Sequence, residues 1–176
     1  AGQREFPLTR ELWIEREDFM EDPPKKYFRL FPGNTVRLKY GYIVKCTGCV
    51  KDADGRVTEV HAEYFPDTKS GTPGADSMKV KGNITWVSTE HAVPAEIRLY
   101  DRLFSDPHPD AGGKNFLDAI NPDSCQVVQG WLEPGTVATP EACWQFERLG
   151  YFVADRELST PGKPVLNRSV TLKDSW

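Results

Sequence analysis

The sequence predicts an all-β protein made of two small β-barrels with little helix. Segments that alternate with a period of two, or that are rich in β-branched and aromatic residues, recur at short intervals along the 176 residues, and residues typical of turns separate them. The length suits one or two compact domains. We interpret the long Pro- and Gly-rich connection at residues 106–113 as a passage between two such units.

Each expected element follows from its local pattern. Residues 35–51 place aliphatic and aromatic side chains at even positions from Val36 to Cys46, which is the pattern of a half-buried strand. Asp54-Gly55 predicts a hairpin turn, because glycine tolerates positive φ. Residues 69–77 are rich in Gly, Pro and Ser and predict a mobile loop. In chain order, the expected strands span residues 12–15, 27–31, 35–51, 57–65, 80–87, 97–104, 126–132, 143–154 and 165–172, with single helical turns at 16–22 and 116–120.

Composition limits the class of protein. Hydrophobic residues make up 39% and aromatic residues 11% of the chain, enough for a core, and we assign Trp13, Trp86, Trp131 and Trp144 to it. No apolar run approaches the roughly 20 residues that a membrane span needs, and no leader pattern is visible. We therefore expect a cytoplasmic protein that does not bind membranes.

The most informative stretch is residues 24–51, which we call the basic segment. It carries seven Lys or Arg side chains and no carboxylate, in a chain of net charge −4. Ordinary surfaces mix the two signs, and cations interleaved with aromatic rings on a β surface suit single-stranded nucleic acid. The alternative is a basic strand that pairs with acidic neighbours of the same molecule. Candidate phosphate contacts in this segment are Lys25, Lys26 and Lys45.

A second candidate patch lies at residues 145–148. In a continuous strand Gln145 and Glu147 would face one way, and Phe146 and Arg148 the other. The Gln amide and the Arg guanidinium can read base edges with two hydrogen bonds each. The alternative is a buried Gln beside an Arg–Glu surface pair.

Other chemistry is not indicated. Cys46 and Cys49 form a C-x-x-C, but no second pair of ligands follows at zinc-site spacing, so we expect reduced cysteines and no metal. The loop around His108 has the oxygen ligands for a divalent cation, although a solvated loop is favoured. No nucleotide-binding or nucleophile motif is found, and we expect no catalytic residue.

Six stretches together give a more specific prediction. They resemble, in order and over nearly the whole chain, the C-terminal anticodon-binding region of bacterial-type glutaminyl-tRNA synthetases. The resemblance implies two ribosomal protein L25-like barrels: a proximal one at residues 1–20 plus 92–176 and a distal one at 21–91. It also implies a monomer whose partners are the anticodon loop of tRNA(Gln) and the enzyme's own catalytic domain. That domain would use ATP and Mg²⁺, and this chain would hold no cofactor. The six stretches are residues 11–19, 80–87, 96–104, 116–122, 145–152 and 167–176.

The resemblance also implies roles for single residues. Arg29 and Arg37 would contact anticodon bases, with Lys39 as a basic neighbour, and Gln145 and Arg148 would serve the middle base. Two positions depart from the family pattern: Phe28 stands where a Lys can occur, and Lys39 where an Arg can. A lysine at the latter position weakens bidentate recognition. Two alternatives stay open: the equivalent module of a glutamyl-type synthetase, and a free-standing barrel that docks RNA or protein.

Overall fold

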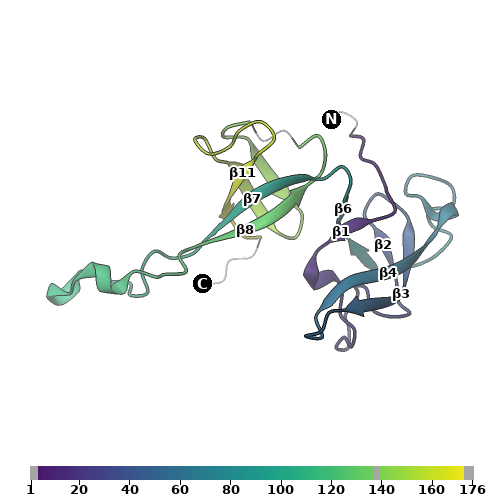
Figure 1. Cartoon of the computed structure of the whole chain (residues 1–176), viewed down its shortest axis with the longest axis horizontal. Coiled ribbons are helices and arrows are strands. Elements are labelled where there is room, and N and C mark those ends of the chain that lie inside the picture. The colour runs from purple at the N-terminus through teal and green to yellow at the C-terminus, as the bar shows by residue number, and fades with distance from the viewer. Residues whose placement is uncertain (1–3, 137–138, 173–176) are drawn as a thin grey trace. The chain divides into compact units, whose positions relative to one another are not determined.

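The computed structural model describes residues 4–136 and 139–172 and confirms the all-β class (Figure 1). Helix is limited, in these residues, to 3-10 segments of three or four residues. The strands form sheets of two, four and five strands. None of the three closes on itself within the described residues, so the expected barrels are observed as open sheets. The resemblance stretch at 167–176 ends outside the described range.

The chain divides into two compact units, which we call the 7–90 unit and the 91–172 unit; the second also contains residues 4–6. The expected division differs at residues 7–20, which lie in the 7–90 unit. The reason is pairing: β1 (Leu12–Ile14) is antiparallel to β6 (Trp86–Ser88), and Phe19 bridges Leu30. Residues 106–113 belong entirely to the 91–172 unit, so the prediction that they connect two units is wrong.

The 7–90 unit is built on a four-stranded sheet of order β4-β3-β2-β5. Its strands are β2 (Thr35–Leu38), β3 (Ile43–Lys51), β4 (Val57–Phe65) and β5 (Gly82–Ile84). The single strand expected at 35–51 is a hairpin instead, because Tyr40 adopts a left-handed φ of 59° and the Leu38 amide donates to the Tyr42 carbonyl at 2.8 Å. The strand expected at 27–31 has no ladder; only the Leu30 bridge forms.

The core of this unit follows the predicted alternation. Even-numbered residues are buried on both strands, as the alternation predicts: Val36, Leu38, Val44 and Cys46. The pattern fails at Ile43, which is also fully buried, and at Tyr40, which is 55% exposed in the turn. Asp54-Gly55 forms the predicted turn, with Gly55 at φ 78° and the Asp52 amide donating to the Arg56 carbonyl at 3.0 Å. The buried cluster consists of Leu30, Val36, Leu38, Val44, Cys46 and Ile84.

The 91–172 unit is built on a five-stranded sheet of order β8-β7-β11-β10-β9 (Figure 1). Strand β7 (Val93–Tyr100) pairs antiparallel with β8 (Cys125–Leu132) and parallel with β11 (Val165–Val170). Strands β9 (Cys143–Phe146) and β10 (Gly150–Ala154) complete the sheet. Its core consists of Ala95, Leu132, Phe152, Ala154 and Leu166.

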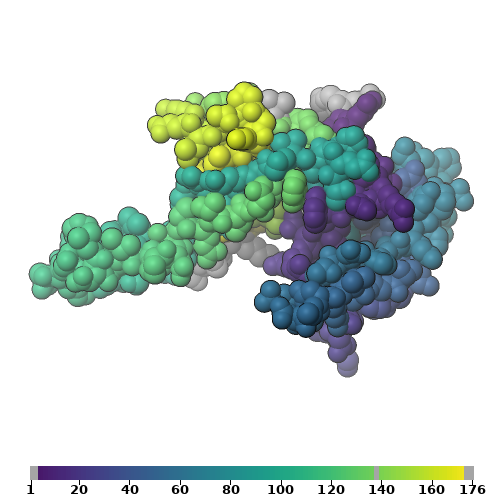
Figure 2. Space-filling view, viewed as in Figure 1, coloured from purple at the N-terminus to yellow at the C-terminus, as the bar shows by residue number. Residues whose placement is uncertain are grey.

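A narrow extension projects from the end of the β7–β8 pair at which Tyr100 lies opposite Cys125 (Figures 1 and 2). The ladder continues past β7 through backbone hydrogen bonds from Asp101 to Ser124, Asn121 to Leu103 and Ser105 to Ala119. Two 3-10 segments follow, η3 (Ala111–Gly113) and η4 (Phe116–Ala119). The second confirms the helical turn predicted at 116–120.

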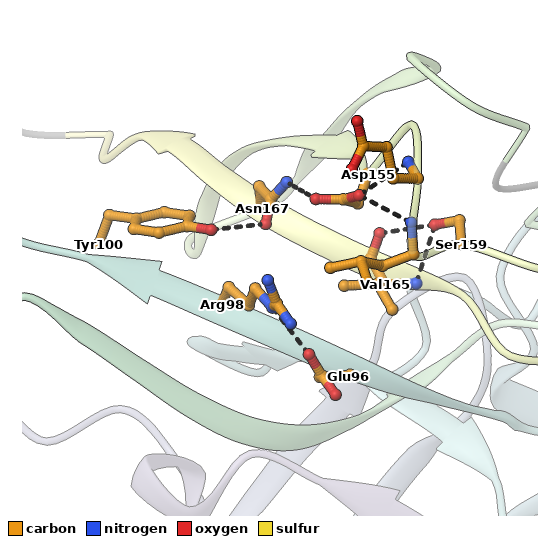
Figure 3. A network of polar contacts seen from close by, with 9 residues as sticks. Glu96, Arg98, Tyr100, Asp155, Ser159, Val165 and Asn167 are labelled. Carbon is orange, nitrogen blue, oxygen red and sulfur yellow. Dashed lines mark hydrogen bonds and ion pairs between the residues drawn. The ribbon is translucent and has the colours of Figure 1, made fainter.

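A polar network fixes the connection between β10 and β11 (Figure 3). The Asp155 carboxylate accepts the amides of Glu157 and Leu158 at 3.0 and 2.9 Å, and its second oxygen accepts the Asn167 side chain at 2.8 Å. These three donors, the Asn167 amide first, hold the pKa of Asp155 below its usual value. Tyr100 extends the network by donating to Asn167 at 3.2 Å.

The tryptophans divide between core and surface. Trp86 packs against the core of the 7–90 unit, and Trp144 is half-buried. Trp13 and Trp131 are 46% and 41% exposed, so their assignment to the core is wrong. Strand membership alone does not bury a side chain, because each strand has two faces. Within the described residues, no helix is long and apolar enough to cross a membrane.

Candidate nucleic-acid interface

The basic segment contributes its cations from several kinds of local structure, all in the 7–90 unit. Lys25 and Lys26 occupy an exposed turn, in which Lys26 has a φ of 71°. Lys45 is exposed on β3. Among the residues the structure describes, no ion pair is recorded for these three ammonium groups, which leaves them available to phosphates. Lys51 differs, because its hydrogen bond to Glu21 uses the charge internally and raises its pKa.

Arg29 is held by a buried carboxylate. Its Nε lies 3.0 Å from Oδ1 of Asp18, whose side chain is only 2% exposed, whereas the Arg29 side chain is 32% exposed. Asp18 ends the 3-10 segment η1 (Arg16–Asp18). One terminal nitrogen, Nη1, also donates to the Phe28 carbonyl at 3.0 Å. The guanidinium is therefore anchored at one edge, while the Arg29 side chain as a whole remains partly exposed.

Arg37 makes a different set of contacts. Nη1 donates to the carbonyls of Thr68 and Gly41 at 2.8 and 3.4 Å and to the Ser70 hydroxyl at 3.3 Å, and Nη2 donates to the Ala75 carbonyl. All four acceptors lie in the β2–β3 turn or in the loop that follows β4. This guanidinium fastens the loop to the turn, and it can reach a base only by giving up some of these bonds.

The loop at 66–77 is consequently attached to the rest of the 7–90 unit at several points, which its Gly-, Pro- and Ser-rich composition does not indicate. Thr68, at 2% exposure, accepts the Ile43 amide at 2.9 Å and donates to the Phe65 carbonyl at 2.7 Å. The Ser70 amide donates to the Gly41 carbonyl at 2.9 Å. A Cβ on Gly74 would lie 1.9 Å from the Asp67 carbonyl oxygen, so only glycine fits this close approach.

Two cation–aromatic pairs lie at the surface of the same unit. The Lys39 ammonium is 5.2 Å from the centre of the Tyr40 ring, which is 55% exposed. The Lys81 ammonium is 5.4 Å from the centre of the Phe28 ring, which is 44% exposed. Exposed rings beside cations provide stacking faces for unpaired bases. The second pair joins Lys81 to Phe28. Because these residues are far apart in the sequence, no local pattern predicts this contact.

Gln145 and Arg148 lie at one end of the β9–β10 hairpin, in the 91–172 unit. The strand expected at 143–154 is interrupted by a turn at 147–149, closed by a 3.0 Å hydrogen bond from the Leu149 amide to the Phe146 carbonyl. Arg148 sits in this turn at φ 68°. Both side chains are exposed, so a buried Gln145 is ruled out. The Phe146 ring packs edge-on against Phe152 at 5.2 Å.

The eight predicted site residues thus fall in two separate units. Arg29, Arg37, Lys39 and the three candidate phosphate ligands belong to the 7–90 unit, and Gln145 and Arg148 to the 91–172 unit. Asp18 was not predicted from the sequence. It lies in a short acidic run (Glu15–Asp18), and nothing local distinguishes it from its neighbours.

The C-x-x-C does not form a metal site in the described structure. Cys46 is fully buried in the core of the 7–90 unit, and burial raises the pKa of its thiol. Cys49 is half-buried, and all four cysteines are free thiols. Among residues 4–136 and 139–172, no group of three or more His, Cys, Asp or Glu side chains is placed to bind a metal ion.

Comparison with known proteins identifies the family. Two family models, each described as "tRNA synthetases class I (E and Q), anti-codon binding domain", match residues 1–65 and 83–155. The chain is 74% identical over its full length to a glutamine–tRNA ligase of Bordetella avium. It is 74% and 73% identical, over 99% of its length, to those of Cupriavidus taiwanensis and Ralstonia nicotianae. It spans 30% of the length of each of these relatives. The chain therefore belongs to the anticodon-binding domains of the class I tRNA synthetases (E and Q).

Proposed function

We propose that this chain is the anticodon-recognition part of a glutamine–tRNA ligase and that its ligand is the anticodon loop of tRNA(Gln). The reaction of the whole enzyme is the ATP- and Mg²⁺-dependent esterification of glutamine to its tRNA, carried out by a catalytic domain elsewhere. This part needs no cofactor and supplies binding energy and base choice. It works in the cytoplasm as a monomer, with the 91–172 unit as the proximal body and the 7–90 unit as the distal body.

The observation that carries the proposal is the ion pair between Arg29 and the buried carboxylate of Asp18. A partly exposed arginine side chain that pairs with a buried carboxylate has a defined position before any ligand arrives. Such pre-organisation suits the reading of a base edge with two hydrogen bonds. Arg29 also lies in the basic segment, which contains seven Lys or Arg residues and no carboxylate.

The remaining predicted residues have complementary roles. Lys25, Lys26 and Lys45 are exposed ammonium groups that position the RNA through its phosphates. Lys39 with Tyr40 offers a charge and a stacking face, and Arg37 contributes to the same surface. Gln145 and Arg148 contact the middle base from the β9–β10 hairpin.

The test is a titration of the chain with anticodon stem-loops at two salt concentrations. We expect tighter binding of the tRNA(Gln) stem-loop than of loops with one anticodon base replaced, and weaker binding of all loops at higher salt. Arg29→Ala should reduce the preference by about 1–3 kcal/mol. Equal binding of all loops would refute base recognition. A preference for the tRNA(Glu) loop would indicate a glutamyl-type module, and binding to folded RNA without any loop preference a free-standing docking domain.

A further inference from the structure

Asp18 is only 2% exposed, and no other charged residue is buried in the part of the chain that the structure describes. It forms an ion pair with Arg29, the arginine that we assign to base reading. A buried carboxylate is costly unless a positive charge or hydrogen bonds compensate it. The position of this carboxylate next to a candidate base reader therefore points to a role beyond packing.

The geometry of the pair determines which part of the guanidinium is left for a ligand. The carboxylate lies against Nε, and one hydrogen of Nη1 goes to the Phe28 carbonyl. Of the hydrogen bonds made by the described residues, none comes from Nη2. One hydrogen on Nη1 and both hydrogens on Nη2 therefore remain, and one from each nitrogen together form the two-pronged donor that matches adjacent acceptors on a base edge.

The backbone around Arg29 is fixed by the same short segment. The Leu30 amide donates to the Asp18 carbonyl at 2.9 Å, and the Met20 amide donates to the Leu30 carbonyl at 3.1 Å. From the other side, the Asn34 side chain donates to the Arg29 carbonyl at 2.6 Å. Asp18 thus restrains Arg29 through both its main chain and its side chain, although residues 27–30 have no strand ladder of their own.

We propose that Asp18 is a positioning residue for RNA specificity: it orients Arg29 so that only one base is accepted at the anticodon position that Arg29 reads. The inference rests on the proposed function. Asp18 itself touches no RNA, and its effect is confined to a single anticodon position, distinct from the middle base assigned to Gln145 and Arg148.

The experiment measures dissociation constants of the full chain for the tRNA(Gln) stem-loop and for three loops, each with one anticodon base replaced. The variants are Asp18→Asn, Arg29→Lys and the double variant. The matched control is Glu96→Gln, which removes a carboxylate from another arginine, Arg98, at a 2.7 Å contact in the 91–172 unit.

In the Asp18→Asn variant we expect the preference for the natural base to fall about tenfold at one position and to stay unchanged at the other two. Arg29→Lys should give the same pattern, and the double variant should lose no more than either single one. The salt dependence should match that of the unmodified chain, because no phosphate contact is removed. The Glu96→Gln control should keep all three preferences.

An equal loss of affinity for all four loops, or an unchanged preference, would show that Asp18 serves stability alone and overturn the inference. In that case the unmodified chain would still discriminate, so the proposed function would survive. If the unmodified chain did not discriminate between the loops, both the inference and the proposed function would be refuted.

A measurement that needs no variant complements this test. On titration with the natural stem-loop, the Arg29 terminal N–H signals should shift in NMR spectra while its Nε–H signal stays in place. A moving Nε–H signal would contradict the fixed pairing with Asp18.

Discussion

Arg29 and Arg37 lie in the same basic segment, yet the fold uses their guanidinium groups in opposite ways. Arg37 donates to four acceptors of its own chain and joins the loop at 66–77 to the β2–β3 turn. Arg29 is pinned at one edge by Asp18 and keeps donors for a ligand. The difference teaches that a cluster of cations is not a uniform binding surface, since some of its charges are already used to build the fold.

The largest effect is expected from Arg37→Ala, which tests its structural role. Four acceptors would lose a charged donor, and hydrogen bonds to charged groups contribute about 1.5–3 kcal/mol each when fully made. We expect the free energy of unfolding of the 7–90 unit to fall by about 3 kcal/mol, measured by urea denaturation. Lys39→Ala is the control and should cost less than about 1 kcal/mol, because a cation–aromatic contact at the surface, such as that of Lys39 with Tyr40, contributes little to stability. Equal stabilities of the two variants would contradict the structural role that we assign to Arg37.

The next effect concerns the coupling between Asp18 and Arg29. Arg29→Ala leaves a buried carboxylate without its cation and should cost about 2 kcal/mol, below the range for fully buried pairs because Arg29 is partly exposed. Asp18→Asn combined with Arg29→Ala should recover part of that loss. A double-mutant cycle on urea unfolding free energies measures the coupling, and additive costs would mean that the ion pair has no net worth.

A smaller effect is expected from Lys25→Ala, which separates phosphate contact from base reading. The variant should bind natural and base-replaced stem-loops more weakly by the same factor, about threefold, and lower the salt slope by about one. Lys114→Ala, whose ammonium already pairs with Asp106 at 2.7 Å, is the control and should leave the slope unchanged. A loss confined to the natural loop would place Lys25 among the base-reading residues.

The smallest expected effect concerns how the stability of the 91–172 unit depends on pH. It extends the comparison from arginines to a carboxylate, Asp155, whose hydrogen bonds are also made within the chain. The pKa of Asp155 is lowered in the folded state by the Asn167 side chain and two backbone amides. The stability from these contacts is present above the usual pKa of 3.8 and is lost as the pH falls through the folded value. Asp155→Asn should therefore flatten the decline of the urea midpoint as the pH falls below the usual pKa of 3.8. Asp123→Asn, at an exposed side chain, should keep the decline.

The candidate site was predictable where chemistry is local. Charge segregation located the basic segment, and the residue types at 145–148 located the hairpin patch. Asp18 was not predictable, because its contact with Arg29 comes from the bridge between Phe19 and Leu30. The anchoring of loop 66–77 was missed for the same reason: its Gly- and Ser-rich composition is typical of a mobile loop, and the contacts that attach it come from Arg37 and Thr68.

The sequence by itself determined the all-β class, the Asp54-Gly55 hairpin, the burial of the even positions 36, 38, 44 and 46, and the family resemblance. These properties depend on side-chain alternation, on the conformational freedom of glycine and on long runs of matching residues, all of which are local. Only the tertiary structure decided that residues 35–51 reverse at Tyr40, that Trp13 and Trp131 lie at the surface, and which arginine keeps donors for a ligand. These outcomes depend on which distant groups compete for the same donor or cover the same face, and that competition exists only once the chain has folded.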